Sequence, residues 1–247
     1  MPSDLARSRK ERRGTELLCE GVFRPLAHPL VLALARLRVP PPAVVVAAGA
    51  AGLAGAVELG HGAYIAAALL VQLKTLLDNA DGQLARLTGR TSAFGRYFDS
   101  EVDLLVNAVL FAALGWRFGQ PALALAGFVA LTAVLSLNFN AARLSSGRVA
   151  EPDSGGGPAT ALLRRIYGIV YAPQDRLAEW MVERRPSLVS PAAVGVLANL
   201  GMSSQLALFG LLLALGRPLA FAWIVLAELG VLVLLLLPQT RPTEEMA

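Results

Sequence analysis

Acidic side chains gather in one short stretch that lies between two long apolar runs. The stretch LLDNADGQLARLTGRTSAFGRYFDSEVDLL, from Leu76 to Leu105, holds Asp78, Asp81, Asp99, Glu101 and Asp103. Positions 78, 81, 82 and 85 share one face of a helix, and positions 95, 99 and 103 share one face of a second helix. A turn at residues 89–91 would make the two helices antiparallel. We therefore expect all the aspartates to meet, with Glu101 pointing elsewhere.

Such a cluster predicts a metal site. A carboxylate at the centre of a membrane-spanning helix costs about 2.5–3.5 kcal/mol on insertion scales, and neighbouring carboxylates repel one another. A divalent cation would remove both costs. A site made only of oxygen atoms suits Mg²⁺, Mn²⁺ or Ca²⁺ better than Zn²⁺. Two metal ions a few ångströms apart are a common device for displacement at phosphorus.

Spacing alone is also compatible with two different roles for the acids. They could form an interfacial ion network with the nearby cations Lys74, Arg86, Arg90 and Arg96, or they could carry cations through the bilayer. The small residues on the acidic faces, Gly82, Ala85 and Gly95, could serve tight helix packing or make room for a flat ligand. Small residues and acids on the same face favour a pocket.

The elements that position these residues are those of a membrane protein. The chain is 55% hydrophobic and 16% charged, whereas soluble domains are about 45–50% apolar and about 25% charged. We therefore predict an all-α integral membrane protein. A spanning helix needs about 20 mostly apolar residues. The sequence offers six candidates: Pro42–Leu59, Gly62–Leu87, Ser92–Trp116, Pro121–Leu144, Ser190–Leu215 and Pro218–Leu237.

The remaining segments complete the predicted organisation. Residues 1–40 form a cytoplasmic N-terminus whose segment Thr15–Arg36 mixes apolar and charged residues, as an interfacial amphipathic helix does. Residues 41–237 form the six-helix domain. Its loop at residues 145–188 opens with the flexible break EPDSGGGP and continues in interfacial helices, and residues 238–247 are a cytoplasmic tail.

The basic residues predict the orientation. Nearly all 22 Lys and Arg residues lie in the N-terminus, in the loop between the second and third candidate helices, in the long loop and in the C-terminus. The positive-inside rule then places both termini and the acidic cluster on the cytoplasmic side. Asp78 would lie roughly 24 Å from the outer end of its helix. The net charge of +4 fits attraction to anionic membrane lipids better than nucleic-acid binding. A composition with only two lysines hints at a GC-rich genome, and we expect a bacterial cytoplasmic membrane.

The spacing also matches a family signature. The residues Asp78, Asp81, Gly82, Ala85, Arg86, Gly95, Asp99 and Asp103 spell D-x-x-D-G-x-x-A-R, eight residues, G-x-x-x-D-x-x-x-D. This resembles the signature of the CDP-alcohol phosphotransferase family at all eight fixed positions. The resemblance implies transfer of a substituted phosphate from a CDP-linked lipid donor, such as CDP-diacylglycerol, to the hydroxyl of a small alcohol or polyol. The implied reaction releases CMP and belongs to phospholipid biosynthesis. The alternative function is an ion-coupled transporter with a carboxylate cation site.

The resemblance also implies roles for particular residues. Asp78, Asp81 and Asp99, with Asp103 nearby, would hold two divalent cations, Mg²⁺ or Mn²⁺, and Asp103 would act as the general base. The CDP-linked donor would contact small and polar residues of the motif and the hydroxyl that follows it, namely Asp78, Gly82, Ala85, Arg86, Ser92 and Gly95.

The acceptor is harder to predict. Candidate residues are Lys74, Asn140, Arg143, Arg148 and Gln205. Two arginines could hold a phosphate of inositol phosphate or glycerol phosphate, or they could simply anchor the helix end. The fifth candidate helix offers polar side chains without a cation, which suits an uncharged polyol or an amino alcohol. Lys74 could instead form a salt bridge with Asp78. A homodimer is left open.

Overall fold

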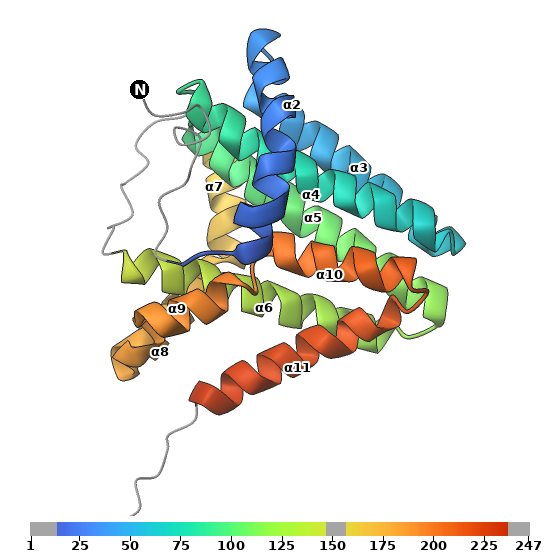
Figure 1. The fold of residues 1–247 in the computed structure, drawn as a ribbon. Helices are drawn as coiled ribbons and strands as arrows, with labels where there is room; N and C mark the ends of the chain where they lie inside the picture. The colour runs from blue at the N-terminus through green and yellow to red at the C-terminus, as the bar shows by residue number, and fades with distance from the viewer. Residues whose placement is uncertain (1–13, 147–156, 237–247) are drawn as a thin grey trace, which may run out of the picture.

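The computed structural model describes residues 14–146 and 157–236, and this part of the chain is helical, without a β-strand (Figure 1). Its elements, in chain order, are the π-helical turn Cys19–Phe23, α2 (Arg24–Arg36), α3 (Pro41–His61), α4 (Tyr64–Leu87), α5 (Ala93–Phe118), α6 (Pro121–Ser145), α7 (Pro158–Val170), α8 (Ala172–Arg184), a 3₁₀ turn (Pro186–Val189), α9 (Pro191–Ala198), α10 (Met202–Ala214) and α11 (Leu219–Leu236). The prediction of an all-helical fold is confirmed for these residues.

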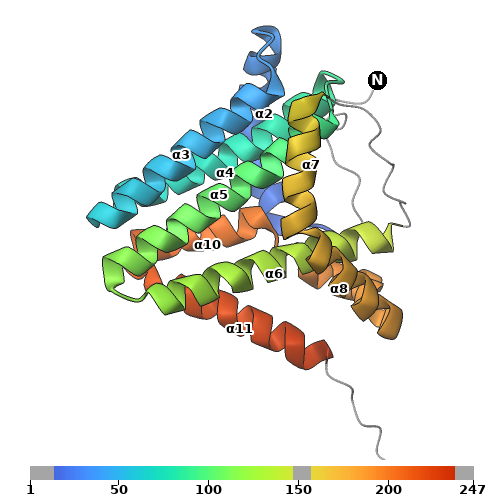
Figure 2. The ribbon, with the colours of Figure 1, turned by 180° about the vertical axis from the view of Figure 1, so that it is seen from behind.

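Three helices carry the acidic stretch and its support. α4 and α5 each pack closely on α3, and far less on each other. The view from behind shows α3, α4 and α5 running alongside one another, with α7 crossing α5 (Figure 2). On the opposite face α2 crosses α4 (Figure 1). The largest cluster of buried apolar side chains joins α3, α4 and α5 to α6, α10 and α11. The acids of α4 and α5 thus face each other over a shared support.

The apolar helices identify a membrane protein. Three helical segments are long and apolar enough to span a bilayer: Pro41–His61, Pro121–Ser145 and Pro191–Ala214. The stretch Leu219–Leu234 is apolar but shorter. α4 and α5 have the length, but they carry the charged side chains of the acidic stretch, which lower their hydropathy. The six predicted spans are therefore supported in part.

The predicted span Ser190–Leu215 corresponds to the apolar segment Pro191–Ala214, but its helix is interrupted. The chain turns at residues 199–201, and α9 ends there before α10 begins. The amide of Asn199 donates to the carbonyls of Gly195 and Thr15, and its oxygen accepts from the backbone N–H of Leu17. An asparagine that bonds to nearby backbone in this way competes with helix formation.

The start of α10 is capped from the N-terminal segment. The Glu16 carboxylate accepts from the backbone N–H of Ser204 at 3.0 Å and from its hydroxyl at 3.2 Å. A Cβ at Gly201 would lie 2.7–2.9 Å from the Glu16 carboxyl group, so a side chain at this position would displace that carboxylate from the cap. An acid at a helix N-terminus is stabilised by the helix dipole. The cap therefore joins the beginning of the chain to its last helices.

The predicted interfacial segments do form helices. The N-terminal segment runs from the π-helical turn into α2, whose Ala27 and Val31 are buried against α4. Next to the acidic stretch, the Cys19 thiol donates to Asn79 Oδ1, and Asn79 Nδ2 donates to Ser203 Oγ, both at 3.1 Å. The long loop contains α7 and α8. Most of its predicted break EPDSGGGP lies outside the described residues, and the interfacial placement of these helices stays a prediction.

Candidate functional site

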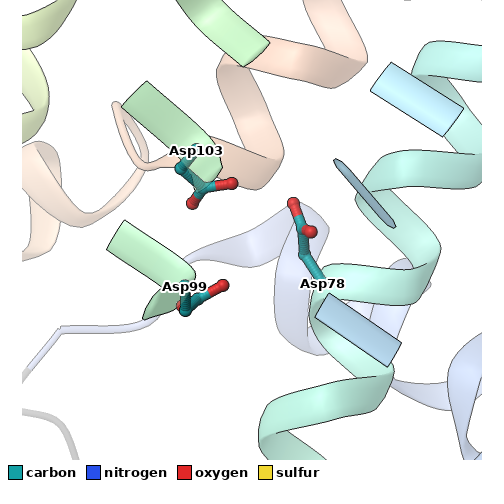
Figure 3. Close-up of side chains that lie close together, drawn as sticks. All are labelled: Asp78, Asp99 and Asp103. Carbon is teal, nitrogen blue, oxygen red and sulfur yellow. The ribbon is translucent and has the colours of Figure 1, made fainter. Parts of the chain in front are cut away.

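The structure brings three of the predicted aspartates together. Asp78 comes from α4, and Asp99 and Asp103 come from α5; Figure 3 shows their side chains turned toward the space between the two helices. Each carboxylate offers an oxygen that lies within 4.8 Å of the other two. The turn that connects the helices uses Gly89 with a φ of +65°, a left-handed conformation that glycine adopts at little cost.

Asp81 lies beside this group with an unsatisfied oxygen. The residue is 7% exposed, and it interacts electrostatically with Asp99, Asp78 and Asp103. Its Oδ2 atom is buried and has no hydrogen-bond partner among the described residues. A buried carboxylate oxygen without a partner is costly. A bound cation would remove this cost.

Lys74 is the cation at the base of the cluster. Its side chain is fully buried, while those of Asp78 and Asp103 are 17% and 19% exposed. The ammonium group forms an ion pair with Asp78 and lies 2.6 Å from Asp103 Oδ1. The predicted salt bridge with Asp78 is therefore present, and it extends to the second helix. One ammonium group cannot balance the charges of all the clustered carboxylates.

The residues present fit a divalent cation. The three clustered aspartates supply oxygen donors only, and the buried Asp81 Oδ2 needs a positive partner. Hard cations such as Mg²⁺, Mn²⁺ and Ca²⁺ take carboxylate oxygens as ligands.

The small residues of the motif border the cluster on the side of the α4–α5 turn. A Cβ at Gly82 would lie 3.2 Å from Arg86 Nη1, so the guanidinium group covers the open face of Gly82. Ala85 is half-buried on the same helix. Ser92 caps α5, because its hydroxyl accepts from the backbone N–H of Gly95 at 3.0 Å. The cap uses the Ser92 oxygen only as an acceptor, so its O–H can still donate a hydrogen bond to a bound ligand.

The predicted acceptor residues are divided among separate polar groups. Asn140 is buried and donates to Asp175 Oδ1 at 2.8 Å, and Arg143 Nη2 lies 2.8 Å from Glu179 Oε1. Gln205 Nε2 donates instead to Glu228 Oε2 at 2.7 Å, between α10 and α11. Lys74 belongs to the aspartate cluster, and Arg148 lies outside the described residues. Only Asn140 and Arg143 share a network, since Arg143 also donates to Asn140 Oδ1.

Sequence reasoning missed a tyrosine beside the acids. The Tyr171 hydroxyl donates to the Ser100 carbonyl at 3.3 Å, and the ring of Tyr171 lies 4.7 Å from that of Tyr167, between centroids. Burial raises the pKa of Tyr171, and the charges of Glu101 and Asp103 raise it further. Tyr171 therefore stays protonated and can donate near the cluster. No spacing rule links it to the motif, because it follows α7, far along the chain.

Known proteins resemble this chain over the region that contains the clustered aspartates. A sequence model described as CDP-alcohol phosphatidyltransferase matches residues 26–197. The phosphatidylinositol phosphate synthase of Mycolicibacterium smegmatis is 30% identical over 132 residues, which cover 51% of this chain and 60% of that protein. The CDP-diacylglycerol–serine O-phosphatidyltransferase of Helicobacter pylori is 34% identical over 83 residues, 31% of this chain and 35% of that protein.

Two further comparisons are more limited. The archaetidylinositol phosphate synthase of Aeropyrum pernix is 42% identical over 50 residues, 20% of this chain and 26% of that protein. The crystal structure of Mycobacterium tuberculosis phosphatidylinositol phosphate synthase with CDP-DAG bound aligns with a TM-score of 0.41 at 24% identity, over 82% of this chain and 94% of that one. The chain thus spans at most 60% of the length of these curated relatives.

Replacement of Asp81 by asparagine tests the metal site without any substrate. Mn²⁺ at about 100 times its Kd should stabilise the wild-type protein by about 2.7 kcal/mol, read as a rise in the unfolding temperature. Asp81→Asn should lose most of this rise, as should Asp78→Asn and Asp99→Asn. Without metal, Asp81→Asn should be at least as stable as wild type, because a buried unpaired charge is gone.

Glu101→Gln is the matched control, because Glu101 lies on α5 outside the group of three. It should keep the full Mn²⁺ response. A wild-type response in Asp81→Asn would show that Asp81 does not help to hold the cation.

Proposed function

The chain belongs to the CDP-alcohol phosphatidyltransferase family, and on that basis we propose that it transfers a phosphatidyl or similar group from a CDP-linked lipid donor to a small alcohol. The observation that carries the proposal is the convergence of Asp78, Asp99 and Asp103 from two helices, next to the unsatisfied oxygen of Asp81. The names of the relatives, which include serine and inositol phosphate enzymes, support a CDP-diacylglycerol donor. They give no support to the alternative of cation transport.

Asp78, Asp81, Asp99 and Asp103 would hold two divalent cations, Mg²⁺ or Mn²⁺. When bound, such cations neutralise the pyrophosphate of the donor and the charge that develops on the departing CMP. Arg86 would add a positive group beside them, and Gly82 and Ala85 would leave room for the nucleotide. Ser92 and Gly95 would approach the donor from the start of α5. This assignment follows the motif, and the Arg86 guanidinium group, which lies over Gly82, would have to move aside for the nucleotide.

Asp103 would act as the general base. It would take the proton of the acceptor hydroxyl while the acceptor oxygen bonds to the donor phosphorus. The bond between that phosphorus and the CMP oxygen breaks, and CMP leaves with the electron pair. Lys74 engages Asp103 Oδ1, so Oδ2 would be the oxygen that receives the proton.

The membrane placement is part of the same proposal. We place six spans in a bacterial cytoplasmic membrane, with both termini and the aspartates on the cytoplasmic side, where CMP can leave into water. The distribution of Lys and Arg supports this orientation. α2, α7 and α8 would then lie at the interface.

A CMP-release assay tests the proposed function. The purified protein would be given CDP-diacylglycerol with Mg²⁺ or Mn²⁺ and, in turn, inositol phosphate, glycerol phosphate, serine and ethanolamine. CMP should appear with one acceptor class, and EDTA should stop its release. No release with any acceptor, while the aspartates bind Mn²⁺, would overturn the proposal.

Replacement of Asp103 by asparagine should lower kcat by about 10²–10⁴, the usual contribution of general acid–base catalysis. The donor KM should change little, because the proton moves only in the transition state. Single-turnover kinetics at saturating Mn²⁺ measure the effect. Recovery of activity at excess metal would show that Asp103 acts only as a ligand.

Arg143→Ala should raise the KM of a phosphate-bearing acceptor about 10- to 100-fold and spare the donor KM. The reason is the loss of a charge-assisted hydrogen bond, worth about 1.5–3 kcal/mol. Glu179→Ala is the opposite change, because it releases Arg143 from its ion pair, and it should lower the same KM. If neither variant moves the acceptor KM, an uncharged polyol or an amino alcohol is favoured.

A further inference from the structure

We propose that Lys74 is the fixed counter-ion of the aspartate cluster and the positioning residue for Asp103. Its charge weakens the binding of divalent cations, and its contact with Asp103 holds the carboxylate of this general base in one orientation. The inference rests on the proposed function for the role of Asp103. The counter-ion part stands on the contacts of Lys74 alone.

Lys74 connects the two helices that carry the acids. Its ammonium group pairs with Asp78 on its own helix and lies 2.6 Å from Asp103 Oδ1 on α5. α4 and α5 otherwise pack on α3 rather than closely on each other. The lysine is therefore a direct tie between them at the depth of the cluster. It fixes one oxygen of Asp103 and leaves the other oxygen available to take the proton of the acceptor hydroxyl.

The surrounding helices are shaped for this side chain. Lys74 is fully buried and is among the largest side chains that are less than 2% exposed. A Cβ at Gly52 of α3 would lie 3.3 Å from Lys74 Cδ and would clash with Val106 of α5. The absence of a side chain at Gly52 thus lets the lysine stem and α5 lie against α3. Lysine stems pack well on apolar surface of this kind.

The charge of Lys74 has a consequence that a purely structural residue would not have. A fixed ammonium group beside the aspartates repels any divalent cation that they bind, since like charges a few ångströms apart interact strongly away from bulk water. Removal of the charge should therefore strengthen cation binding. The same removal frees the Asp103 carboxylate to rotate and should slow turnover. Cation affinity and kcat are expected to move in opposite directions.

Lys74→Met is the main test, because methionine keeps an unbranched stem without the charge. Mn²⁺ binding to the purified full-length protein would be measured by electron paramagnetic resonance, without substrate. The Kd for Mn²⁺ should fall about tenfold. In the CMP-release assay, kcat at saturating Mn²⁺ should fall at least about tenfold, with the donor KM changed less than about threefold.

Lys74→Arg keeps the charge, so its Kd for Mn²⁺ should stay close to that of wild type and its kcat should exceed that of Lys74→Met. Lys74→Gln carries the same expectations as Lys74→Met and supplies the test if the methionine variant does not fold. Thr75→Val is the matched control: Thr75 is the next buried residue of α4, and its hydroxyl bonds only to its own helix, at the Val71 carbonyl. It should match wild type in both measurements.

Two results would overturn the inference. Mn²⁺ binding that is unchanged or weaker in both neutral variants would show that Lys74 does not oppose the cation. Unchanged kcat would show that it does not position Asp103. A wild-type protein that binds Mn²⁺ but releases no CMP would refute the proposed function instead, and the Mn²⁺ affinities of the variants would still decide the counter-ion role.

Discussion

Mutual repulsion among carboxylates on two adjacent helices, α4 and α5, is the constraint that shapes this protein. Asp78, Asp99 and Asp103 lie within reach of one common ligand, and such a group is unstable without positive charge. Lys74 supplies part of that charge, and α3 holds the two helices so that their acidic faces meet over a shared support. A divalent cation bound to the aspartates would supply the partner that the buried Asp81 oxygen lacks among the described residues.

The sequence alone predicts what depends on local spacing. The faces of α4 and α5, the turn at Gly89 and the meeting of three aspartates follow from helical periodicity over one short stretch. Contacts between distant segments do not follow from it. The break between α9 and α10 depends on Asn199 and on Glu16, which lie far apart in the sequence. The separation of α4 from α5 likewise depends on α3, whose apolar sequence gives no sign of this role.

The predicted acceptor residues Asn140 and Arg143 also make contacts with distant segments that the sequence does not predict. Arg143 looks like a phosphate ligand when only its own helix is considered. In the folded protein it pairs with Glu179, and its neighbour Asn140 donates to Asp175. Both acids come from α8, in the loop segment for which the sequence predicts interfacial helices but no contact with Arg143. Whether Asn140 and Arg143 are available to a ligand therefore depends on their contacts with α8, and not on their own helix alone.

The cap of α10 by Glu16 also affects the order in which the chain can fold during its synthesis. Glu16 is synthesised well before its partner Ser204, which lies 188 residues further along the chain. The N-terminal segment must therefore wait for the last helices before it can dock completely, and contacts between such distant residues form late. Until Ser203 has been synthesised, the polar surface of α4 at Asn79 lacks one of the partners that it has in the folded protein. A chain that stalls before α10 would leave this polar surface open to chaperones and proteases in the membrane.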